Sequence, residues 1–191
     1  MFRSRNKKKA IGRATEYASC KDFQQIFNED MAGLHRLAYL LTADHAKAEQ
    51  CFVAGLENSI HGNPVFRQWA RAWSKRAIIQ SAIKTIEPTP TRHGAIPDAP
   101  QAQWQNGNNV ESIAAIVASW EPFERFVFVM AVLEGYGLRE CAALLACPVQ
   151  DVITAKSFAM QRLAAQSSSE IVSPDREYVR RNKGFARTQV A

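Results

Sequence analysis

The sequence predicts an all-α protein of two small helical domains joined by a flexible linker, and the second domain contains a helix-turn-helix. Three observations predict this fold. Apolar residues recur at spacings of three and four residues in both halves, which is the period of amphipathic helices. Residues 87–108 are rich in Pro, Gly, Gln and Asn and show no helical period. No segment keeps the alternation that is typical of a β-strand.

Three helices are predicted for the first domain, residues 19–86. The apolar positions from Cys20 to Leu41 favour one continuous helix. Asp44 is the predicted N-cap of a second helix, which runs from about His45 to Ser59. An Asn-Pro pair indicates the start of the third helix, Pro64 to about Ile86, because proline fits the first turn of a helix.

Two tight breaks divide the second domain, residues 109–166. Glycines in Glu134–Gly137 can supply the left-handed backbone that ends one helix. Ala146–Pro148 separates an apolar helix, Leu138–Leu145, from a last helix that begins at Val149. This layout is typical of a helix-turn-helix, whose second helix enters the major groove of DNA.

The composition bounds the class of protein. The 191 residues are 47% hydrophobic and 22% charged, which suffices for a core and argues against wholesale disorder. Because no apolar run reaches about 18 residues, we expect no membrane span. The four cysteines form no CxxC pair and the four histidines no metal-ligand spacing. We therefore expect reduced thiols in a cytoplasmic protein, with no metal or other cofactor.

The net charge of +6 is concentrated at the two ends of the chain. Residues 1–17 hold six Lys and Arg against one Glu, and residues 166–191 hold five against three acidic residues. We expect a basic flexible arm at 1–18 and a basic polar tail at 167–191. Such ends can hold phosphate by counterion release, and solvated tails without a partner are the alternative.

A known family shares specific residues with both halves. Leu37–Glu49 and Phe66–Trp73 match two segments of its first domain. Its second domain follows the pattern R.VF.L…EG.S..E.A..L..P…V, and the matching residues here are Arg125, Val127, Phe128, Leu133, Glu134, Gly135, Leu138, Glu140, Ala142, Leu145, Pro148 and Val152. The chain thus resembles the extracytoplasmic-function type of RNA polymerase sigma factor, a branch of the sigma-70 superfamily. Residues 19–86 resemble sigma domain 2, and residues 109–166 resemble sigma domain 4.

This resemblance implies a bacterial, promoter-specific transcription initiation factor. Its partners would be core RNA polymerase and promoter DNA, with an anti-sigma factor as a further candidate. The polymerase-binding positions would be Glu49, Gln50 and Val53, although the family has other residue types at the last two. In the last helix, Ile153 and Phe158 stand where the family presents Lys and Arg. The chain is therefore expected to be a divergent member at its contact positions.

Eight residues are candidates for DNA contact. Four cations on the third helix can bind phosphates, because no acidic residue occurs between Phe66 and Ile86; a solvated face is the alternative. Four polar residues in the first turns of the last helix can contact bases or phosphates. The full set is Arg67, Arg71, Lys75, Arg76, Gln150, Thr154, Lys156 and Ser157.

Other side chains leave alternatives open. Trp69 and Trp73 can stack on unpaired bases, but their spacing of four residues on an apolar stripe favours burial in the core. Arg125 and Glu140 are expected to form a structural ion pair.

No phosphate loop or catalytic grouping is recognisable in the sequence, so we expect no enzymatic activity and no small-molecule substrate. The alternative function is a sigma-like protein-interaction module, which binds an anti-sigma factor or another regulator without reading DNA. Phe158 and Met160 in the last helix favour that alternative, because apolar side chains suit a protein partner.

Overall fold

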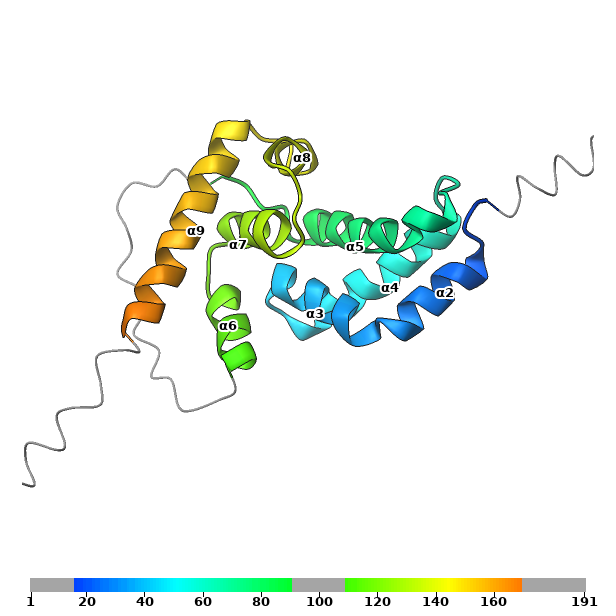
Figure 1. The fold of residues 1–191 in the computed structure, drawn as a ribbon, viewed down its shortest axis with the longest axis horizontal. Helices are drawn as coiled ribbons and strands as arrows, with labels where there is room; N and C mark the ends of the chain where they lie inside the picture. Colours follow the sequence, from blue (N-terminus) through cyan, green and yellow to red (C-terminus); the bar gives the residue numbers. More distant parts are fainter. Residues whose placement is uncertain (1–15, 91–108, 170–191) are drawn as a thin grey trace, which may run out of the picture.

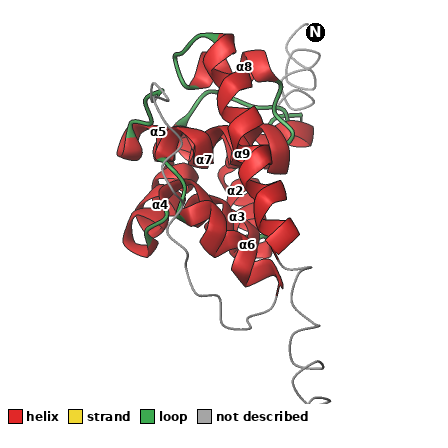
Figure 2. Ribbon diagram, turned by 90° about the vertical axis from the view of Figure 1, so that its left-hand side faces the viewer, coloured by secondary structure: helices red, strands yellow, loops and turns green. Residues whose placement is uncertain are grey.

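The computed structural model of this chain describes residues 16–90 and 109–169. Within these ranges the chain is helical, with one isolated β-bridge between Tyr17 and Phe66, and the predicted all-α class is confirmed (Figure 2). Most of the predicted arm, linker and tail lies outside the described residues. We call residues 16–90 the N-terminal half and residues 109–169 the C-terminal half.

Figure 1 shows the order of the helices. The N-terminal half contains α2 (Cys20–Glu29), α3 (Met31–Thr42), α4 (His45–His61), the 3₁₀ turn η1 (Arg67–Trp69) and α5 (Ala70–Ile86). The C-terminal half contains α6 (Asn109–Ala118), α7 (Pro122–Phe128), the π-helical η2 (Val129–Leu133), α8 (Leu138–Leu144) and α9 (Val149–Ser169).

The continuous helix predicted from Cys20 to Leu41 is wrong, because the chain breaks at Asp30. Asp30 has φ −116° and ψ 28°, outside the helical region, and it ends α2 by donating its N–H to the Ile26 carbonyl at 3.0 Å. Its side chain lies where a Cβ at position 33 would be, and Gly33 leaves that space free. Aspartate competes with helical hydrogen bonding through such local contacts, which apolar periodicity does not record.

The predicted helix start at Pro64 is also wrong, because α5 begins six residues later. The intervening residues pair with the start of the described chain. Ala18 donates its N–H to the Val65 carbonyl and Arg67 donates to the Glu16 carbonyl, both at 2.8 Å. The rings of Tyr17 and Phe66 stack with their centroids 4.8 Å apart. This long-range pairing keeps the backbone extended where the proline signal favoured a helix. By contrast, Asp44 caps α4 as predicted, accepting the Lys47 N–H at 3.0 Å.

The helices of the two halves share one hydrophobic core. Leu37 and Leu41 of α3 belong to the same buried cluster as Val117, Phe126 and Val129. Figure 1 shows the two halves next to each other at the middle of the molecule, where α3 of the N-terminal half contacts α6, α7 and η2 of the C-terminal half. The described helices of the two predicted domains are therefore in direct contact.

A buried arginine lies at this contact. The Arg125 side chain is 5% exposed, and its Nε donates to the Leu41 carbonyl at 3.1 Å. Its Nη1 donates to the carbonyls of Ala118 at 3.2 Å and Trp120 at 2.9 Å. Burial lowers the pKa of Arg125, and Glu121 opposes that shift. The predicted Arg125–Glu140 pair is wrong, since the guanidinium is held by these backbone carbonyls.

We predict that Gly55→Ala destabilises the fold. A Cβ at Gly55 of α4 would come within 2.5 Å of Ile78 Cγ1 and 3.2 Å of the Ile78 backbone on α5. Overpacking costs about 1–3 kcal/mol, which exceeds the roughly 1 kcal/mol that alanine gains over glycine in a helix. Urea denaturation should show a lower free energy of unfolding.

Gly137→Ala is the matched control. Gly137 has φ −65°, and a Cβ there would meet nothing within 4 Å. We expect its free energy of unfolding to change by less than about 1 kcal/mol. Equal losses in the two variants would contradict the close α4–α5 contact.

Candidate nucleic-acid interface

An open cleft of about 1220 Å³ separates the first turns of α5 from the segment that follows η2. It combines aromatic rings with cationic side chains, as single-stranded nucleic-acid sites do. The aromatic residues along it are Phe66, Trp69, Trp73 and Tyr136, and the cations are Arg71, Lys75 and Arg76. The opposite wall carries two carboxylates, Glu134 and Glu140.

The π-helix η2 brings the acidic wall to α5. Glu134 donates its N–H to the Val129 carbonyl at 2.9 Å, five residues back, and Tyr136 donates to the Met130 carbonyl at 2.9 Å. Gly135 follows with φ +73°, a left-handed conformation that glycine adopts without steric cost. The wider π turn and this glycine end the helix early and turn the chain toward α5. The predicted break at Glu134–Gly137 is confirmed.

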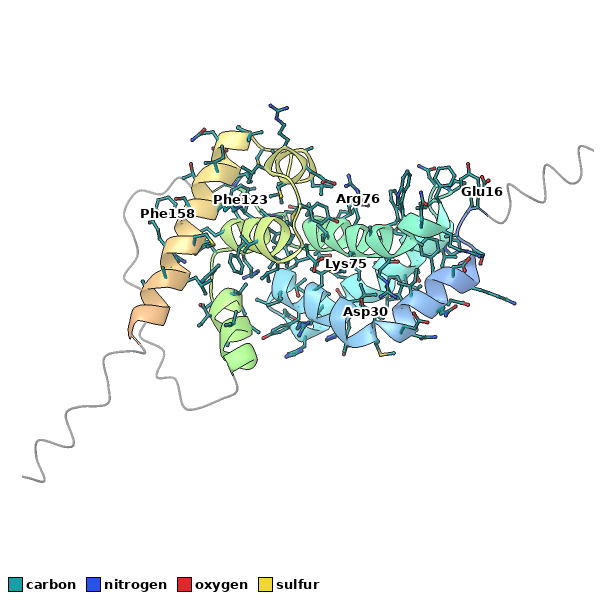
Figure 3. All side chains as sticks on the ribbon, viewed as in Figure 1. Glu16, Asp30, Lys75, Arg76, Phe123 and Phe158 are labelled. Atoms are coloured by element: carbon teal, nitrogen blue, oxygen red, sulfur yellow. The ribbon has the colours of Figure 1, made fainter. Side chains whose placement is uncertain are left out.

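Two ion pairs cross the cleft between the halves. Lys75 Nζ lies 2.8 Å from Glu134 Oε2, and Arg76 Nη1 lies 2.5 Å from Glu140 Oε1. We call these the cross-half pairs. Figure 3 shows Lys75 and Arg76 on α5, near the middle of the molecule.

The other two predicted cations, Arg67 of η1 and Arg71 of α5, pair with acidic residues of α2 and of the α2–α3 junction. Arg67 Nη2 lies 3.1 Å from Asp22 Oδ2. Arg71 reaches both Glu29 and Asp30, at 3.4 Å each. Hydrogen bonds from Ser19 lower the pKa of Asp22, and Arg67 adds to that shift. Surface pairs of this kind contribute little stability. They do, however, neutralise Arg67 and Arg71, which were predicted to bind phosphates.

The charge of the α5 face is therefore not positive in this arrangement. Four cations meet five carboxylates from α2, from the α2–α3 junction and from the C-terminal half. Each of these acidic residues lies far from its partner in the sequence. The prediction considered only the acidic residues between Phe66 and Ile86 and therefore missed these partners. A phosphate that binds here would compete with these carboxylates for the cations.

The two tryptophans that line the cleft, Trp69 and Trp73, differ in their burial. Trp69 is 56% exposed, so the interpretation of Trp69 as a core residue is wrong. Trp73 is half-buried against the cluster of Phe23, Val65 and Ala70, and its Nε1 is buried without a hydrogen-bond partner. Trp69 meets Phe66 edge to face, with ring centroids 5.4 Å apart. An exposed aromatic surface, formed by Phe66 and Trp69, therefore lies at the N-terminal end of α5.

The helix-turn-helix of α8 and α9 has the predicted breaks. Ala146 takes a left-handed conformation with φ +51°, and Cys147 donates its N–H to the Ala142 carbonyl at 3.1 Å. Val152, Ala155 and Ala159 form the buried side of α9. α9 is thus anchored along one side.

The α9 candidates lie in different environments. Gln150 and Ser157 are exposed, whereas Thr154 and Lys156 are half-buried. The Thr154 hydroxyl donates to the Gln150 carbonyl at 2.9 Å. Ile153, 42% exposed, lies between Gln150 and Ser157 at helical spacing. One face of α9 therefore presents Gln150, Ile153 and Ser157 together.

The predicted polymerase-binding residues share an exposed surface of α4. Glu49 and Gln50 are exposed, and Val53 on the next turn is 53% exposed. Their neighbours Ala48 and Cys51 point into the core. An exposed valine between polar residues suits contact with a protein.

Several kinds of site are absent from the parts of the chain that the structure describes. Across residues 16–90 and 109–169, no group of three His, Cys, Asp or Glu side chains is arranged to hold a metal ion. No helix within the same ranges is both long and apolar enough to cross a bilayer. Comparisons with known protein families and with curated proteins found no match for this chain.

We predict that Tyr136 makes stability depend on alkaline pH. Burial raises the pKa of its phenol from 10 to about 12; the nearby carboxylates of Glu140 and Glu134 add to the shift and Arg76 opposes it. Between pH 10 and pH 12 the folded protein holds a proton that the unfolded protein has lost. The free energy of unfolding therefore falls as pH rises through this window. Urea denaturation of Tyr136→Phe should show a smaller fall than the original protein, and equal slopes would contradict the assignment.

Proposed function

We propose that this chain is a divergent sigma factor that binds core RNA polymerase and directs it to promoter DNA through α9. The observation that carries this proposal is the exposed face at the start of α9, on a helix anchored along its opposite side. A recognition helix needs both properties, because its scaffold must hold it firmly while its first turns reach base edges in the major groove.

The exposed residues have suitable chemistry for reading bases. Gln150 can donate and accept hydrogen bonds, which matches the edge of adenine. Ile153 offers an apolar contact for the methyl group of thymine, and Ser157 can bond to several base edges. Lys156, half-buried beside them, is the cation nearest to this face along α9. This combination favours an A·T-rich element.

The N-terminal half supports two further steps of initiation. The exposed surface of Glu49, Gln50 and Val53 on α4 is available to the polymerase. The cleft presents Trp69 and Phe66 beside cations, and stacking of an unpaired base on such a ring contributes about 1–3 kcal/mol. These features support promoter melting by the same half.

A second candidate function is a protein-interaction module that binds a helical regulator without reading DNA. The observation that favours it is the apolar content of the α9 surface, where Val149, Ile153 and Met160 are 37%, 42% and 44% exposed. The ion pairs of the α5 cations also favour this function, because paired cations are less available to the phosphates of DNA. Such a module would bind an anti-sigma factor or another regulator through α9.

The deciding experiment is capture of core RNA polymerase by the full chain, followed by selection of bound promoter sequences and transcription from them. Binding with specific initiation supports the sigma factor. Val53→Asp on α4 should weaken polymerase capture, whereas Glu57→Gln, an exposed change on the same helix, should not. Failure to bind polymerase, together with tight binding of a helical regulator, would support the interaction module.

We predict that α9 variants separate base reading from phosphate binding. Gln150→Ala should weaken binding to the selected site by about 1–3 kcal/mol and relax its base preference. Lys156→Gln should weaken binding to all sequences and reduce the salt slope by about one unit.

The measurement is fluorescence anisotropy with labelled duplexes at several salt concentrations. Gln161→Ala, an exposed change farther along α9, is the control and should bind as the original protein does. If Gln150→Ala and Gln161→Ala behaved alike, Gln150 would have no part in base reading.

A further inference from the structure

An acidic side chain is buried inside the C-terminal half. Glu124 of α7 is 2% exposed, and Phe123 and Phe126 of the same helix are buried apolar residues. Burying a carboxylate costs free energy unless a cation or hydrogen-bond donors replace the lost water. A cation is present, because Nη1 of Arg162 on α9 lies 3.1 Å from Oε2 of Glu124. This ion pair joins α7 to the predicted recognition helix, which packs beside it (Figure 1).

Arg162 lies on the side of α9 away from Gln150, Ile153 and Ser157, which we call the reading face. Arg162 follows Ala155 by seven residues, or about two turns, so it continues the buried side of the helix. It follows Ile153 by nine residues, about two and a half turns, and therefore lies on the opposite side, about 14 Å farther along the axis. An effect of Arg162 on base reading therefore has to pass through the placement of α9.

The apolar contacts of α9 specify its placement only weakly. Among the residues of α9 whose burial the structure describes, the fully buried ones are Val152, Ala155 and Ala159. Alanine side chains interlock little with a facing helix, and the hydrophobic effect has no direction. A charge-assisted contact is directional and requires a short distance. Buried ion pairs add little net stability compared with apolar substitutes, but they can select one arrangement among several.

We infer that Glu124 is a positioning residue of the recognition helix: its carboxylate holds Arg162 and so fixes the rotation and axial position of α9 on α7. This inference rests on the proposed function, since base reading by α9 is the process that the pair would control. A shift of α9 by one residue would turn the reading face by about 100° and move Gln150 away from its base. The pair thus determines base preference without touching DNA.

The first test replaces the pair with apolar side chains. Because a buried carboxylate without its cation destabilises a fold strongly, Glu124→Met and Arg162→Met are combined. This double methionine variant should melt at about the temperature of the original protein. Its preference for the selected promoter site over a one-base variant of that site should fall about tenfold in fluorescence anisotropy. An unchanged preference would overturn the inference.

Folding of the variant is checked by circular dichroism. If the double methionine variant is unfolded, Glu124→Gln takes its place, because it keeps the shape of the side chain and removes the charge. The same fall in base preference is then expected, and an unchanged preference has the same meaning.

Arg162→Lys separates the charge from the packing. Lysine keeps a cation on a flexible unbranched stem, as methionine keeps the stem without the charge. Arg162→Lys should therefore retain most of the base preference that the double methionine variant loses. Gln161→Met, an exposed change at the neighbouring position, is the matched control and should change the preference by less than about twofold. Equal losses in Arg162→Lys and in the double methionine variant would show a packing role and contradict the inference.

Salt dependence distinguishes positioning from contact with phosphate. In a positioning role, the double methionine variant keeps its affinity for a duplex of arbitrary sequence and its salt slope, because no phosphate contact is lost. A direct contact would instead weaken binding to all sequences and reduce the salt slope by about one unit. That result would assign Arg162 to the DNA interface and refute its positioning role.

The second test measures the placement of α9 without DNA. Spin labels at Ala115→Cys on α6 and Ser157→Cys on α9 give the distance between these helices by pulsed electron paramagnetic resonance. α6 is a suitable reference, because Arg125 of α7 donates to the Ala118 carbonyl at its end. The accessible cysteines Cys20 and Cys147 are replaced by serine.

The double methionine variant should give a shifted or broader distance distribution than the original protein, and Arg162→Lys should give the original one. The same distribution in all three proteins would show that the apolar contacts alone place α9, and the inference would fail.

These outcomes are separable from those for the proposed function. The distance measurement needs neither polymerase nor DNA. A pair that places α9 in a chain that binds no promoter would refute the sigma-factor proposal alone. A chain that initiates at a specific promoter with the same base preference after loss of the pair would refute the role of Glu124 alone.

Discussion

The arrangement of the two halves depends on the guanidinium of Arg125, which is held at the C-terminal ends of two helices, α3 and α6. It fixes α7 against the C-terminal end of α3 through the Leu41 carbonyl and against the end of α6 through Ala118 and Trp120. The partial negative charge at a helix C-terminus favours a cation there. Because η2 continues directly from α7, the same contact determines where Glu134 meets α5.

Local signals in the sequence predicted the helix-turn-helix well. A glycine at position 135 and the Ala146–Pro148 turn act through the backbone of a few neighbouring residues, and both breaks occur where they were expected. Long-range contacts explain the errors elsewhere. The Asn-Pro pair that favoured a helix at Pro64 could not reveal the pairing of residues 16–18 with residues 65–67. The break at Asp30 depends on the fit of one side chain over Gly33.

The candidate site shows the same difference between local signals, which the sequence contains, and long-range contacts, which it does not reveal. Composition alone identified the cations of α5, but their acidic partners come from α2 and from residues 134 and 140, which no spacing rule connects to them. Trp69 was expected on the buried stripe of a continuous helix. It instead belongs to η1, whose 3₁₀ geometry of about three residues per turn does not keep the phase of α5. The exposed ring is a consequence of that change of phase.

The π-helix η2 makes this segment tolerant of a change in length. A π turn holds one residue more than an α turn. Deleting one residue from Val129–Leu133 should therefore let the segment relax to α-helical form and leave the chain after it, with Glu134 and Glu140, directed toward α5. The same deletion in a regular α-helix such as α4 would rotate all later residues of that helix by about 100°. A one-residue difference in length therefore disturbs the acidic wall less at η2 than it would in a regular helix.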